Sequence, residues 1–502
     1  MLDLSKLCID AVLMQAFRVA SLDENPLHFD HEYARNTHFG GLVAYGVLVG
    51  LAALARLGVT SNYTTDEVWM EFRTAVFPDD HYVIESRNIN GQFVVSVMDG
   101  PKTVLRAGAT LRVGLNPQSI ASGLGESGRT LPRKGGFPAV GSLVRGNYNP
   151  AWPEIQVLSK LLGLDNSPFS QVHLAAFAFC SYLAGMELPG ERALLRRVVL
   201  AFQPIGDIVC TGFNYDAKVQ AWNDRLALAT VGLSLSTDLG VNLAVGQLQV
   251  FERFLPPPID TTGPVTCELS DRVALVVGGS RGLGAAFVHG LHRHGATVIG
   301  VSRSNSKSEA EMAAKTAAGG GLIRSIQADG ADREDCVAIV KEILVEFGKL
   351  DLLICNASPP LNRPRLSLTE TGRLKDYVDA ALAVVEEPLS AALPALSIFR
   401  GTVVIVSSSA VVNSPREWPD YVAAKIAVEK LAWSLARINP TVRFIILRPP
   451  RLLTGFTLNA SLGNSLEPHR VVQRLITLLL EARPTQWSVV DRFGSTEANE
   501  YP

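Results

Sequence analysis

The stretch VALVVGGSRGLG, residues 273–284, joins an unbroken apolar segment to a turn that contains four glycines. Five consecutive apolar residues, Val273–Val277, favour a strand that is buried on both faces. An alanine-rich segment with a helical pattern follows Gly284. Glycines between a strand and a helix let the backbone approach a pyrophosphate, whose charge the N-terminus of the helix stabilises. The stretch therefore predicts the start of a dinucleotide-binding domain.

The rest of the C-terminal half alternates short apolar segments with longer helical patterns. The expected strands are Val273–Val277, Thr297–Val301, Leu322–Gln327, Leu352–Cys355, Val403–Val406, Arg443–Leu447 and Ser488–Val490. Nearly continuous apolar strands need helices on both faces of a parallel sheet. We therefore expect an α/β doubly wound (Rossmann) domain over residues 269–495.

The N-terminal half contains a repeat, because residues 22–28 read LDENPLH and residues 164–170, which lie 142 positions further on, read LDNSPFS. Each copy precedes an apolar run long enough for a buried helix, Gly40–Leu57 in the first and Val172–Met186 in the second. The strand-like segments that follow are Val68–Val76, His81–Ser86, Phe93–Met98 and Thr103–Val113, then Arg196–Gln203, Asp207–Phe213, Leu226–Ser236 and Asn242–Phe251.

One helix followed by a meander of strands is an α+β plan. Seen twice, at residues 1–115 and 137–255, it looks like a double hot-dog fold, in which a sheet wraps a central helix. A proline-rich linker at residues 256–268 precedes the dinucleotide-binding domain. Few residues precede the first copy, so we expect the first strand of that hot-dog domain to be missing.

Composition limits the kinds of partner and compartment. The 502 residues are too many for one hydrophobic core, and the formal net charge is only -2 with scattered Lys and Arg, so we expect no nucleic-acid partner. The six cysteines lack the paired spacing of a metal or redox site, which predicts reduced thiols and no metal. Neither a leader-like N-terminus nor a run of 18 apolar residues occurs, which predicts a cytoplasmic protein without membrane insertion.

The C-terminal half resembles the short-chain dehydrogenase/reductase family in motif order and content. Ser408, Tyr421 and Lys425 match its catalytic set, with thirteen residues from Ser to Tyr and four, one helical turn, from Tyr to Lys. Ketone reduction needs a hydride at carbon and a proton at the developing alkoxide, and a phenol with a pKa of about 10 is a slow acid without a neighbouring cation. The resemblance makes Tyr421 the general acid, Ser408 a donor to the carbonyl, and Lys425 the cation and a ribose ligand.

The same resemblance implies a set of cofactor-binding residues. They are Gly278, Ser280, Arg281, Gly282, Leu283, Gly284, Ser302, Arg303, Asp329, Asn356, Ala357, Tyr421, Lys425 and Thr454. An acidic residue after the second strand would repel the 2'-phosphate of NADP, whereas this chain has Arg303 there and Arg281 in the glycine turn. We therefore expect NADPH as the cofactor.

Two positions depart from that family. A helix Asn about 28 residues before the catalytic Ser completes a proton relay in the family, and Ala380 or Ala381 stands there in this chain. Loss of one relay member lowers turnover within the range of about 100 to 10,000-fold that is usual for acid–base assistance, unless another water takes its place. Pro450 also stands where the family usually has Gly.

The segment around Asp23, Asn25, Pro26 and His28 resembles the MaoC-like family of (R)-specific enoyl hydratases over about 30 residues. Removing water from a 3-hydroxyacyl thioester needs a base at C2, an acid for the hydroxyl and donors for the enolate oxygen. The resemblance assigns His28 to the C2 proton and Asp23 to the hydroxyl, with backbone N–H groups of residues 41–46 as donors that Asn25 orients. Asp, Asn and Pro also build ordinary turns and caps, which is the structural alternative.

The second copy keeps Asp165 but has Ser167 and Ser170 in place of Asn25 and His28. It therefore lacks the base and is interpreted as a structural partner that shapes the acyl pocket. His173 is interpreted as a core or capping histidine.

The two resemblances together predict a bifunctional enzyme. One half would reduce a 3-ketoacyl thioester, on coenzyme A or an acyl carrier protein, and the other would dehydrate the (R)-3-hydroxyacyl product to the trans-2-enoyl thioester. One alternative is the oxidative direction, hydration followed by dehydrogenation, as in multifunctional β-oxidation enzymes. Another is a dehydratase whose silent reductase half serves in binding or dimerisation. Both families imply a homodimer or larger assembly.

Overall fold

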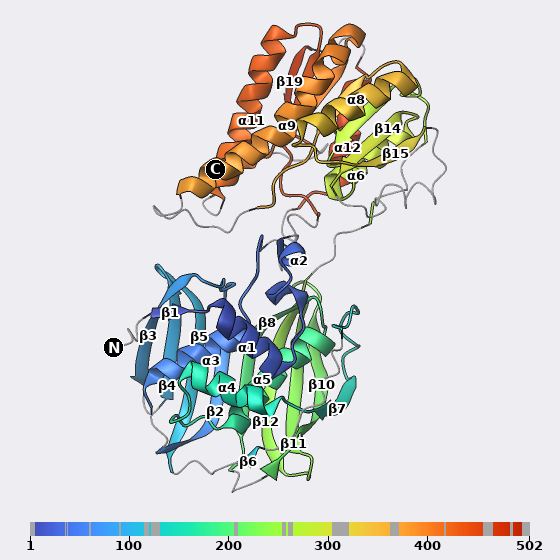
Figure 1. The fold of residues 1–502 in the computed structure, drawn as a ribbon. Helices are drawn as coiled ribbons and strands as arrows, with labels where there is room; N and C mark the ends of the chain where they lie inside the picture. Colours follow the sequence, from blue (N-terminus) through green and yellow to red (C-terminus); the bar gives the residue numbers. More distant parts are fainter. Residues whose placement is uncertain are drawn as a thin grey trace. The chain divides into compact units, whose positions relative to one another are not determined.

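A computed structural model describes residues 6–35, 37, 39–59, 62–89, 92–114, 120–121, 131–204, 209–253, 258–259, 265–303, 321–361, 371–415, 418–454, 465–481 and 485–493. The chain divides into two compact units (Figure 1). Met1–Arg35 and Gly41–Phe254 make up nearly all of the first unit, and Leu255–Leu458 and Leu462–Pro502 nearly all of the second.

The first unit is built on one antiparallel sheet of ten strands to which both repeats contribute five. From one edge to the other the strands are β1 (Lys6–Cys8), β3 (His81–Ile89), β4 (Gln92–Asp99), β5 (Lys102–Val113), β2 (Tyr63–Phe72), β8 (Ala193–Phe202), β12 (Asn242–Glu252), β11 (Leu228–Thr237), β10 (Phe213–Asn223) and β7 (Leu143–Tyr148). Read inward from either edge, the two repeats place equivalent strands in the same order. The duplication predicted from the sequence therefore governs the whole sheet.

The two repeats meet at a hydrogen-bonded seam in the middle of this sheet. Strand β2 pairs antiparallel with β8, with Val68 opposite Leu200 and Met70 opposite Val198. All four of these side chains are fully buried and belong to a single core that draws residues from both repeats. The hot-dog halves thus share one sheet and one core.

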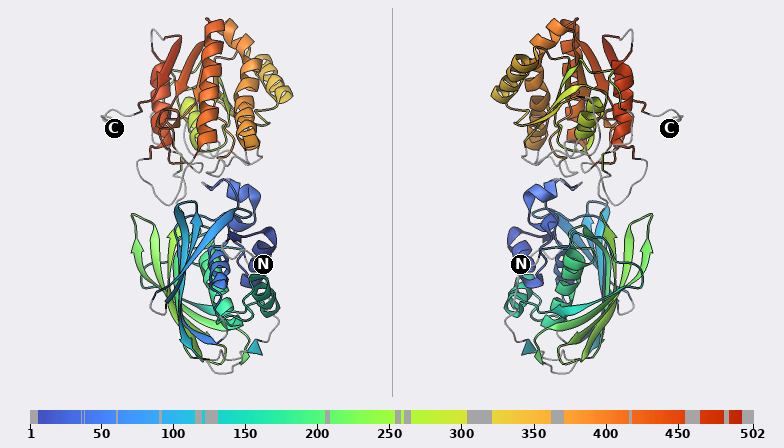
Figure 2. Two further views of the ribbon diagram at one scale, coloured as in Figure 1. Left: turned by 90° about the vertical axis from the view of Figure 1, so that its left-hand side faces the viewer. Right: turned by 90° about the vertical axis from the view of Figure 1, so that its right-hand side faces the viewer.

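The sheet curves around helices that the two repeats contribute in matching order (Figure 2). The first repeat supplies α1 (Ala11–Ser21), the 3-10 turn η1 (Pro26–His28), α2 (His31–Arg35), α3 (Gly46–Leu54) and η2 (Ala55–Leu57), and the second supplies α4 (Trp152–Leu162), α5 (Gln171–Tyr182) and the π-turn η3 (Leu183–Glu187). Helix α3 lies so close to β2 that a Cβ atom on Gly50 would collide with the side chain of Met70.

The edge of this sheet differs from the expectation. A first strand is present, because Lys6–Cys8 pairs with β3 as β1. Helices α1 and α4 and strand β7 were not foreseen. Within the strand expected at Asp207–Phe213 the structure has the two-residue strand β9 (Val209–Cys210), which pairs with β6 (Ile120–Ala121), while residues 205–208 lie outside the described residues. The long strand begins only at Phe213, as β10, in which buried Tyr215 and Val219 alternate with more exposed residues.

The second unit holds a parallel sheet of seven strands with Rossmann order. The strands are β15 (Ile323–Gln327), β14 (Thr297–Ser302), β13 (Val273–Val277), β16 (Leu352–Cys355), β17 (Thr402–Val406), β18 (Arg443–Leu447) and β19 (Trp487–Val490). All seven coincide with expected strands to within two residues. The fold is the doubly wound domain that the apolar rhythm predicted.

Helices cover both faces of this sheet, so alternate residues of one strand enter different cores. Ala274 and Val276 face a core completed by α6 (Gly282–Arg293) and α12 (Pro468–Leu479). Val273, Leu275 and Val277 face a core completed by α8 (Arg333–Phe347), α9 (Thr371–Phe399) and α11 (Pro419–Ile438). A short helix, α10 (Ala410–Asn413), follows β17.

Helix α9 contains the one stretch of the described residues, Leu374–Phe399, that is long and apolar enough to cross a membrane by length and composition alone. It packs against α8, α11 and β16. Core helices of water-soluble proteins pass the same test, so the feature alone is weak evidence for a membrane span.

Candidate active sites

The dehydratase motif forms a tight loop between α1 and α2. Asn25 begins the 3-10 turn η1, with its side-chain oxygen accepting from the backbone N–H of Leu27 at 3.1 Å, and Pro26 occupies the first position of the turn. The Asn25 side-chain nitrogen donates to the carbonyl of Gly190 at 3.4 Å. Both ends of this amide therefore hold the turn in place, and its orienting role at the site stays a prediction.

His28 is held in one tautomer by the backbone. Its Nδ1 lies 2.7 Å from the carbonyl oxygen of Val43, and because a carbonyl can only accept, Nδ1 carries the proton. Nε2 then keeps its lone pair. Desolvation lowers the pKa of His28 to about 4, so the ring is neutral at pH 7 and can accept a proton at Nε2.

Asp23 lies five residues earlier and is 1% exposed. One carboxylate oxygen, Oδ2, accepts from the hydroxyl of Ser181 at 2.7 Å, and Oδ1 accepts from the backbone N–H of Asn25 at 3.1 Å. Burial raises the pKa of Asp23 to about 7, although both hydrogen bonds oppose that rise. The carboxyl group can therefore both hold and release a proton near neutral pH.

Tyr45 connects these two residues. Its hydroxyl donates to the backbone carbonyl of Asp23 at 2.9 Å, and its ring packs on the imidazole of His28 with the centroids 4.0 Å apart. Asp23 and His28 are thus gathered around one fully buried aromatic side chain.

Some of the backbone N–H groups of residues 41–46 that were expected to be oxyanion donors are already hydrogen-bonded within the protein. Val43 and Ala44 already donate to the carbonyls of Leu27 and Val76, at 3.2 and 2.7 Å. Helix α3 begins at Gly46 and has no side-chain cap at its N-terminus, so the first N–H groups of that helix are the better candidates.

The matching loop of the second repeat has a different arrangement. Asp165 is exposed and accepts from Ser159 at 3.0 Å. Ser170 caps helix α5 and exchanges hydrogen bonds with His173, whose Nδ1 accepts from the backbone N–H of Ser170 at 2.9 Å. His173 is a buried capping histidine, as the sequence predicted.

The glycine turn of the second unit is shaped so that side chains could not replace its glycines. Gly278 has φ +82°, and a Cβ atom there would lie 2.8 Å from the backbone nitrogen of Ala357. A Cβ on Gly284 would meet the carbonyl of Gly278 and lie 2.6 Å from the side-chain nitrogen of Asn356, which donates to that carbonyl at 2.9 Å. Helix α6 begins at Gly282, so the turn presents backbone N–H groups at a helix N-terminus, which fits a pyrophosphate.

Several other predicted cofactor residues surround this turn. Gly282 lies close to Thr454, since a Cβ on the glycine would be 3.4 Å from that side chain. Gly278 and Gly279 donate to the carbonyl of Val301, which places the turn beside the end of β14, where Ser302 and exposed Arg303 follow.

Of the remaining predicted cofactor residues, three lie within the turn itself and Asp329 lies outside it. Ser280 is half-buried, Arg281 is exposed and Leu283 is buried in the core. The Asp329 carboxylate accepts from the backbone N–H of Ala331 at 3.0 Å, so in this structure it stabilises a local turn.

The three predicted catalytic residues of the reductase come together. Tyr421 and Ser408 are hydrogen-bonded, and the Nζ of Lys425 lies 5.6 Å from the centroid of the Tyr421 ring. Lys425 is 6% exposed and donates to the carbonyl of Val406 at 2.9 Å. Burial lowers the pKa of Lys425 to about 8.

From the sequence we expect Lys425 to lower the pKa of Tyr421, but in the structure that pKa is raised. Burial raises it, and the hydrogen bond with Ser408 only partly opposes that rise. The desolvation of the buried phenol therefore outweighs the stabilisation of the phenolate by Ser408.

Mainly apolar side chains surround the position where the family has the relay Asn. Ala381 packs with Tyr377 and Ala424 in a small buried cluster that also touches Tyr421. The Tyr377 hydroxyl donates to the carbonyl of Pro359 at 3.3 Å.

Sequence reasoning missed residues that reach the sites from distant parts of the chain. Ser181 bonds Asp23 across 158 positions, and Tyr45 bonds it across 22. Glu429 accepts two hydrogen bonds from Arg448, at 2.9 and 2.6 Å, and one from Ser407, the neighbour of Ser408. No local pattern marks Ser181 or Tyr45. Glu429 could have been noticed, because it lies one helical turn after Lys425 and so on the same face of the helix.

The first unit thus holds an acid–base site on a hot-dog fold, and the second unit holds a Ser, Tyr and Lys set on a Rossmann fold. Family comparisons agree: residues 272–462 match the family described as short chain dehydrogenase, and residues 6–103 match the MaoC like domain. The chain belongs to the short-chain dehydrogenase family through its C-terminal half and carries a MaoC-like dehydratase domain at its N-terminus.

Individual proteins are similar to part of this chain. An uncharacterized oxidoreductase of Mycobacterium tuberculosis is 30% identical over 191 residues, 37% of this chain and 72% of that protein. A 3-oxoacyl-(acyl-carrier-protein) reductase of Staphylococcus aureus is 33% identical over 167 residues, 33% of this chain and 67% of that protein. The structure of an alcohol dehydrogenase from Thermococcus sibiricus, complexed with 5-hydroxy-NADP, is 24% identical with a TM-score of 0.41 and covers 46% of this chain and 99% of its own.

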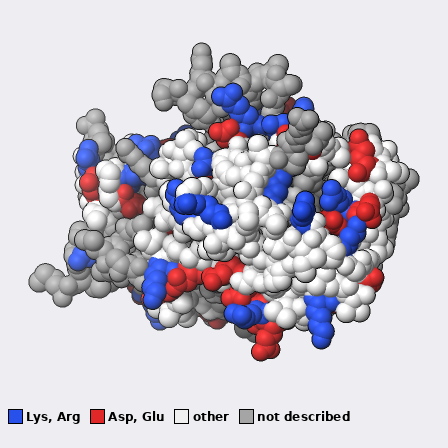
Figure 3. All heavy atoms as spheres, turned by 90° about the horizontal axis from the view of Figure 1, so that it is seen from above, with Lys and Arg blue, Asp and Glu red and all other residues white. Residues whose placement is uncertain are grey.

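Two features of the surface and side-chain chemistry complete the description. Positive and negative side chains both occur across the face shown in Figure 3, in places side by side and elsewhere among uncharged ones. Within the described ranges, no three His, Cys, Asp or Glu side chains gather in a group that could hold a metal ion.

Proposed function

We propose that this protein is a bifunctional enzyme that acts twice on one acyl chain. Its C-terminal half reduces a 3-ketoacyl thioester to the (R)-3-hydroxyacyl thioester with NADPH, and its N-terminal half dehydrates that product to the trans-2-enoyl thioester. The product of the first reaction is the substrate of the second. The acyl group would be carried by coenzyme A or by an acyl carrier protein.

The observation that carries the proposal is the opposite displacement of two pKa values on the dehydratase loop. The pKa of His28 is lowered to about 4 and that of Asp23 is raised to about 7, so at neutral pH a neutral base and a residue whose carboxyl group can be protonated both contact Tyr45. Environments that push two pKa values in opposite directions are typical of an acid–base pair.

The dehydration step follows from these protonation states. Nε2 of His28 takes a proton from C2, and the electrons of the broken C–H bond form the double bond between C2 and C3. The bond from C3 to oxygen breaks as Asp23 gives its proton to the departing hydroxyl, which leaves as water. N–H groups at the start of α3 would stabilise the negative charge on the thioester oxygen.

The reductase step needs a hydride, which NADPH would supply when bound. Tyr421 donates the proton to the ketone oxygen, Ser408 holds that oxygen by a hydrogen bond, and Lys425 supplies positive charge beside the phenol. Preference for NADPH over NADH is supported by Arg281 at the start of α6 and Arg303 at the end of β14, because two cations there would attract a 2'-phosphate.

A second candidate function is a dehydratase with a silent reductase half. Ala381 beside Tyr421 favours it, because the proton relay of the family would lose a polar member there. NADPH binding without turnover would characterise this alternative.

The test is NADPH and NADH consumption by the full chain with a short 3-ketoacyl-CoA, with products followed by mass. The proposal expects NADPH-dependent formation of the 3-hydroxyacyl species and of the species that is one water lighter. Tyr421→Phe should abolish the first product and His28→Ala only the second, so each variant controls for the other. The second candidate would be favoured if (R)-3-hydroxyacyl-CoA is dehydrated but no NADPH is consumed with the 3-ketoacyl group, whether that group is carried by coenzyme A or by a carrier protein.

A further inference from the structure

The loop that carries Asp23 and His28 is built against the second repeat. Besides the bond from Ser181 to Asp23, hydrogen bonds join this loop and the end of α1 to the second repeat: Tyr148 Oη donates to Ser21 O at 3.1 Å, Glu24 N to Met186 Sδ at 3.1 Å and Asn25 Nδ2 to Gly190 O at 3.4 Å. The repeat that lacks the histidine therefore supports the backbone of the repeat that has it.

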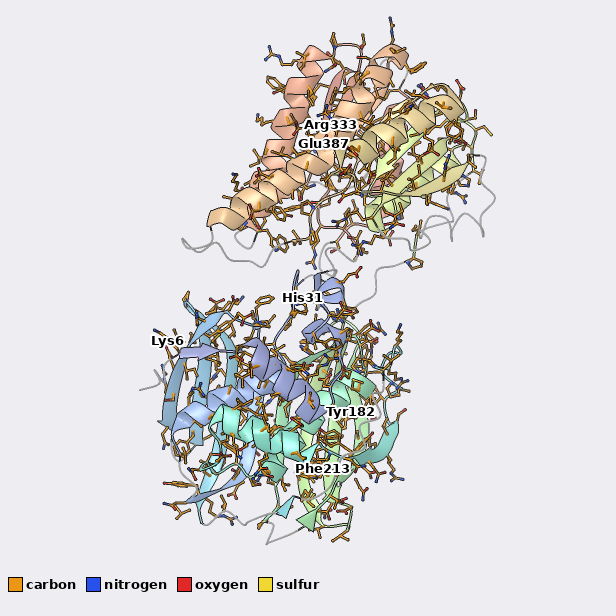
Figure 4. The ribbon with its side chains drawn as sticks, viewed as in Figure 1. Lys6, His31, Tyr182, Phe213, Arg333 and Glu387 are labelled. Atoms are coloured by element: carbon orange, nitrogen blue, oxygen red, sulfur yellow. The ribbon has the colours of Figure 1, made fainter. Side chains whose placement is uncertain are left out.

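The Asp23 carboxyl group itself meets the second repeat at two points. Ser181, on the last turn of α5, donates to Oδ2 at 2.7 Å and is itself 4% exposed. Tyr182 marks that end of α5 in Figure 4. The chain then enters the π-turn η3, where a Cβ atom on Gly185 would lie only 2.8 Å from the carboxyl carbon of Asp23.

We propose that the second repeat is part of the dehydratase site, with Ser181 and Gly185 as the positioning residues that fix the carboxyl group of Asp23. This inference rests on the dehydratase function proposed above. The short bond from Ser181 fixes one oxygen, and the bare backbone of Gly185 leaves the room that the group fills. Single π-turns within helices are often found at functional sites, and here the wider turn brings Gly185 against Asp23.

The chemistry explains why such support is needed. A carboxyl group that must protonate a leaving hydroxyl has to present one oxygen in one direction, and free rotation about its last bond would spoil this. The Asn25 N–H holds Oδ1 and Ser181 holds Oδ2, so the orientation is fixed from both sides. A hydroxyl group can also rotate to accept from the protonated acid, so Ser181 serves both protonation states.

The first experiment compares Ser181→Ala with Ser159→Ala, which removes the equivalent hydroxyl-to-carboxylate bond to Asp165 in the second repeat. Because Ser181 stabilises the charged form of Asp23, its loss should move the alkaline limb of the dehydration kcat/KM profile upward by about one pH unit. The turnover at the optimum should fall about 10 to 100-fold. Ser159→Ala should leave the profile in place, and Ser181→Thr, which keeps the hydroxyl, should restore it.

The second experiment uses Gly185→Ala, which leaves the Ser181 bond intact and only fills space beside Asp23. Its control is Gly114→Ala, where a Cβ would have ordinary contact with Thr64 at 3.5 Å. We expect Gly185→Ala to lower kcat for dehydration about 10 to 100-fold with little change in KM, and the control to match the wild type. Far-UV circular dichroism and thermal unfolding of each variant report whether the first unit, which contains Gly185 and Gly114, is folded.

The outcomes separate the two proposals. If His28→Ala abolishes dehydration while Ser181→Ala and Gly185→Ala both behave as wild type, the positioning role is wrong and the dehydratase function stands. If His28→Ala retains full dehydration, the proposed site itself is wrong.

Discussion

The two repeats of the N-terminal unit share one backbone plan but use the same side chains in different ways. Asp23 is 1% exposed and bonded to Ser181, whereas its equivalent Asp165 is exposed and bonded to Ser159. The contrast shows that the surroundings of an aspartate decide whether it can hold a proton near neutral pH, because desolvation raises the pKa of Asp23 to about 7.

The histidines differ in the role that Nδ1 plays toward the backbone. In the first repeat Nδ1 of His28 donates to a carbonyl, which frees Nε2 to accept a proton. In the second repeat Nδ1 of His173 accepts from the N–H of Ser170, so its lone pair is spent on capping α5. A histidine near a repeated motif is therefore not evidence of a second site.

The largest expected effect separates His28→Ala from His173→Ala. Removing the base should lower dehydration kcat/KM by about 100 to 10,000-fold with little change in thermal stability. Removing His173, a capping and core residue, should lower the melting temperature while the remaining folded protein keeps its activity. Steady-state kinetics and thermal unfolding of both variants check this, and equal losses of activity would break the comparison.

A smaller effect is expected for Asp23→Asn against Asp165→Asn. An amide can still donate a hydrogen bond to the leaving hydroxyl but cannot transfer a proton, so Asp23→Asn should lose about 100-fold in dehydration turnover. Asp165→Asn should stay within about twofold of the wild type, because its carboxylate is exposed and accepts from Ser159 of its own repeat. Single-turnover dehydration of a 3-hydroxyacyl-CoA measures both.

The pH dependence sharpens the comparison further. Dehydration requires Asp23 protonated, and its pKa is about 7, so kcat/KM should fall about tenfold per unit as the pH rises above 7. On the acid side His28 must be neutral, and its pKa of about 4 places the second limb near that value. Asp165→Asn should leave both limbs unmoved. A profile that stays flat from pH 6 to 9 would contradict the assignment of Asp23.

The smallest expected effect concerns the turn caps. Asn25 and Ser167 accept from backbone N–H groups two residues on, Leu27 and Phe169, at 3.1 and 3.2 Å. Alanine at either position should cost about 1 kcal/mol of stability. Only Asn25→Ala should also lower dehydration turnover, because only that turn carries a base; chemical denaturation and kinetics of the pair distinguish the two roles.

Most of the fold could be predicted because its signals are local. The apolar strands of the second unit are recognisable as unbroken apolar runs such as Val273–Val277, and the repeat is visible as two similar seven-residue stretches. The edge elements were harder. Strand β1 has only three residues, Lys6–Cys8, and its place is fixed by pairing with β3 rather than by any pattern of its own.

The candidate sites could be predicted only as far as one segment of chain supplies them. Asp23, Asn25 and His28 lie within six residues, and Tyr421 and Lys425 within one helical turn, so spacing alone reveals them. Ser181 and Gly185 lie about 160 residues from Asp23 along the chain, in a repeat that reads as inactive. Close approach across the core brings them to Asp23, and no spacing rule encodes that contact.

The seam between β2 and β8 has a consequence for how this chain can be divided. Each of these strands occupies what would otherwise be a bare sheet edge of the other repeat, with unpaired N–H and C=O groups and an apolar inner face. Expressed alone, residues 1–115 would expose that edge and are expected to aggregate or to pair with copies of themselves. The repeats share one sheet and one core, so a shorter protein made from the first unit must keep both.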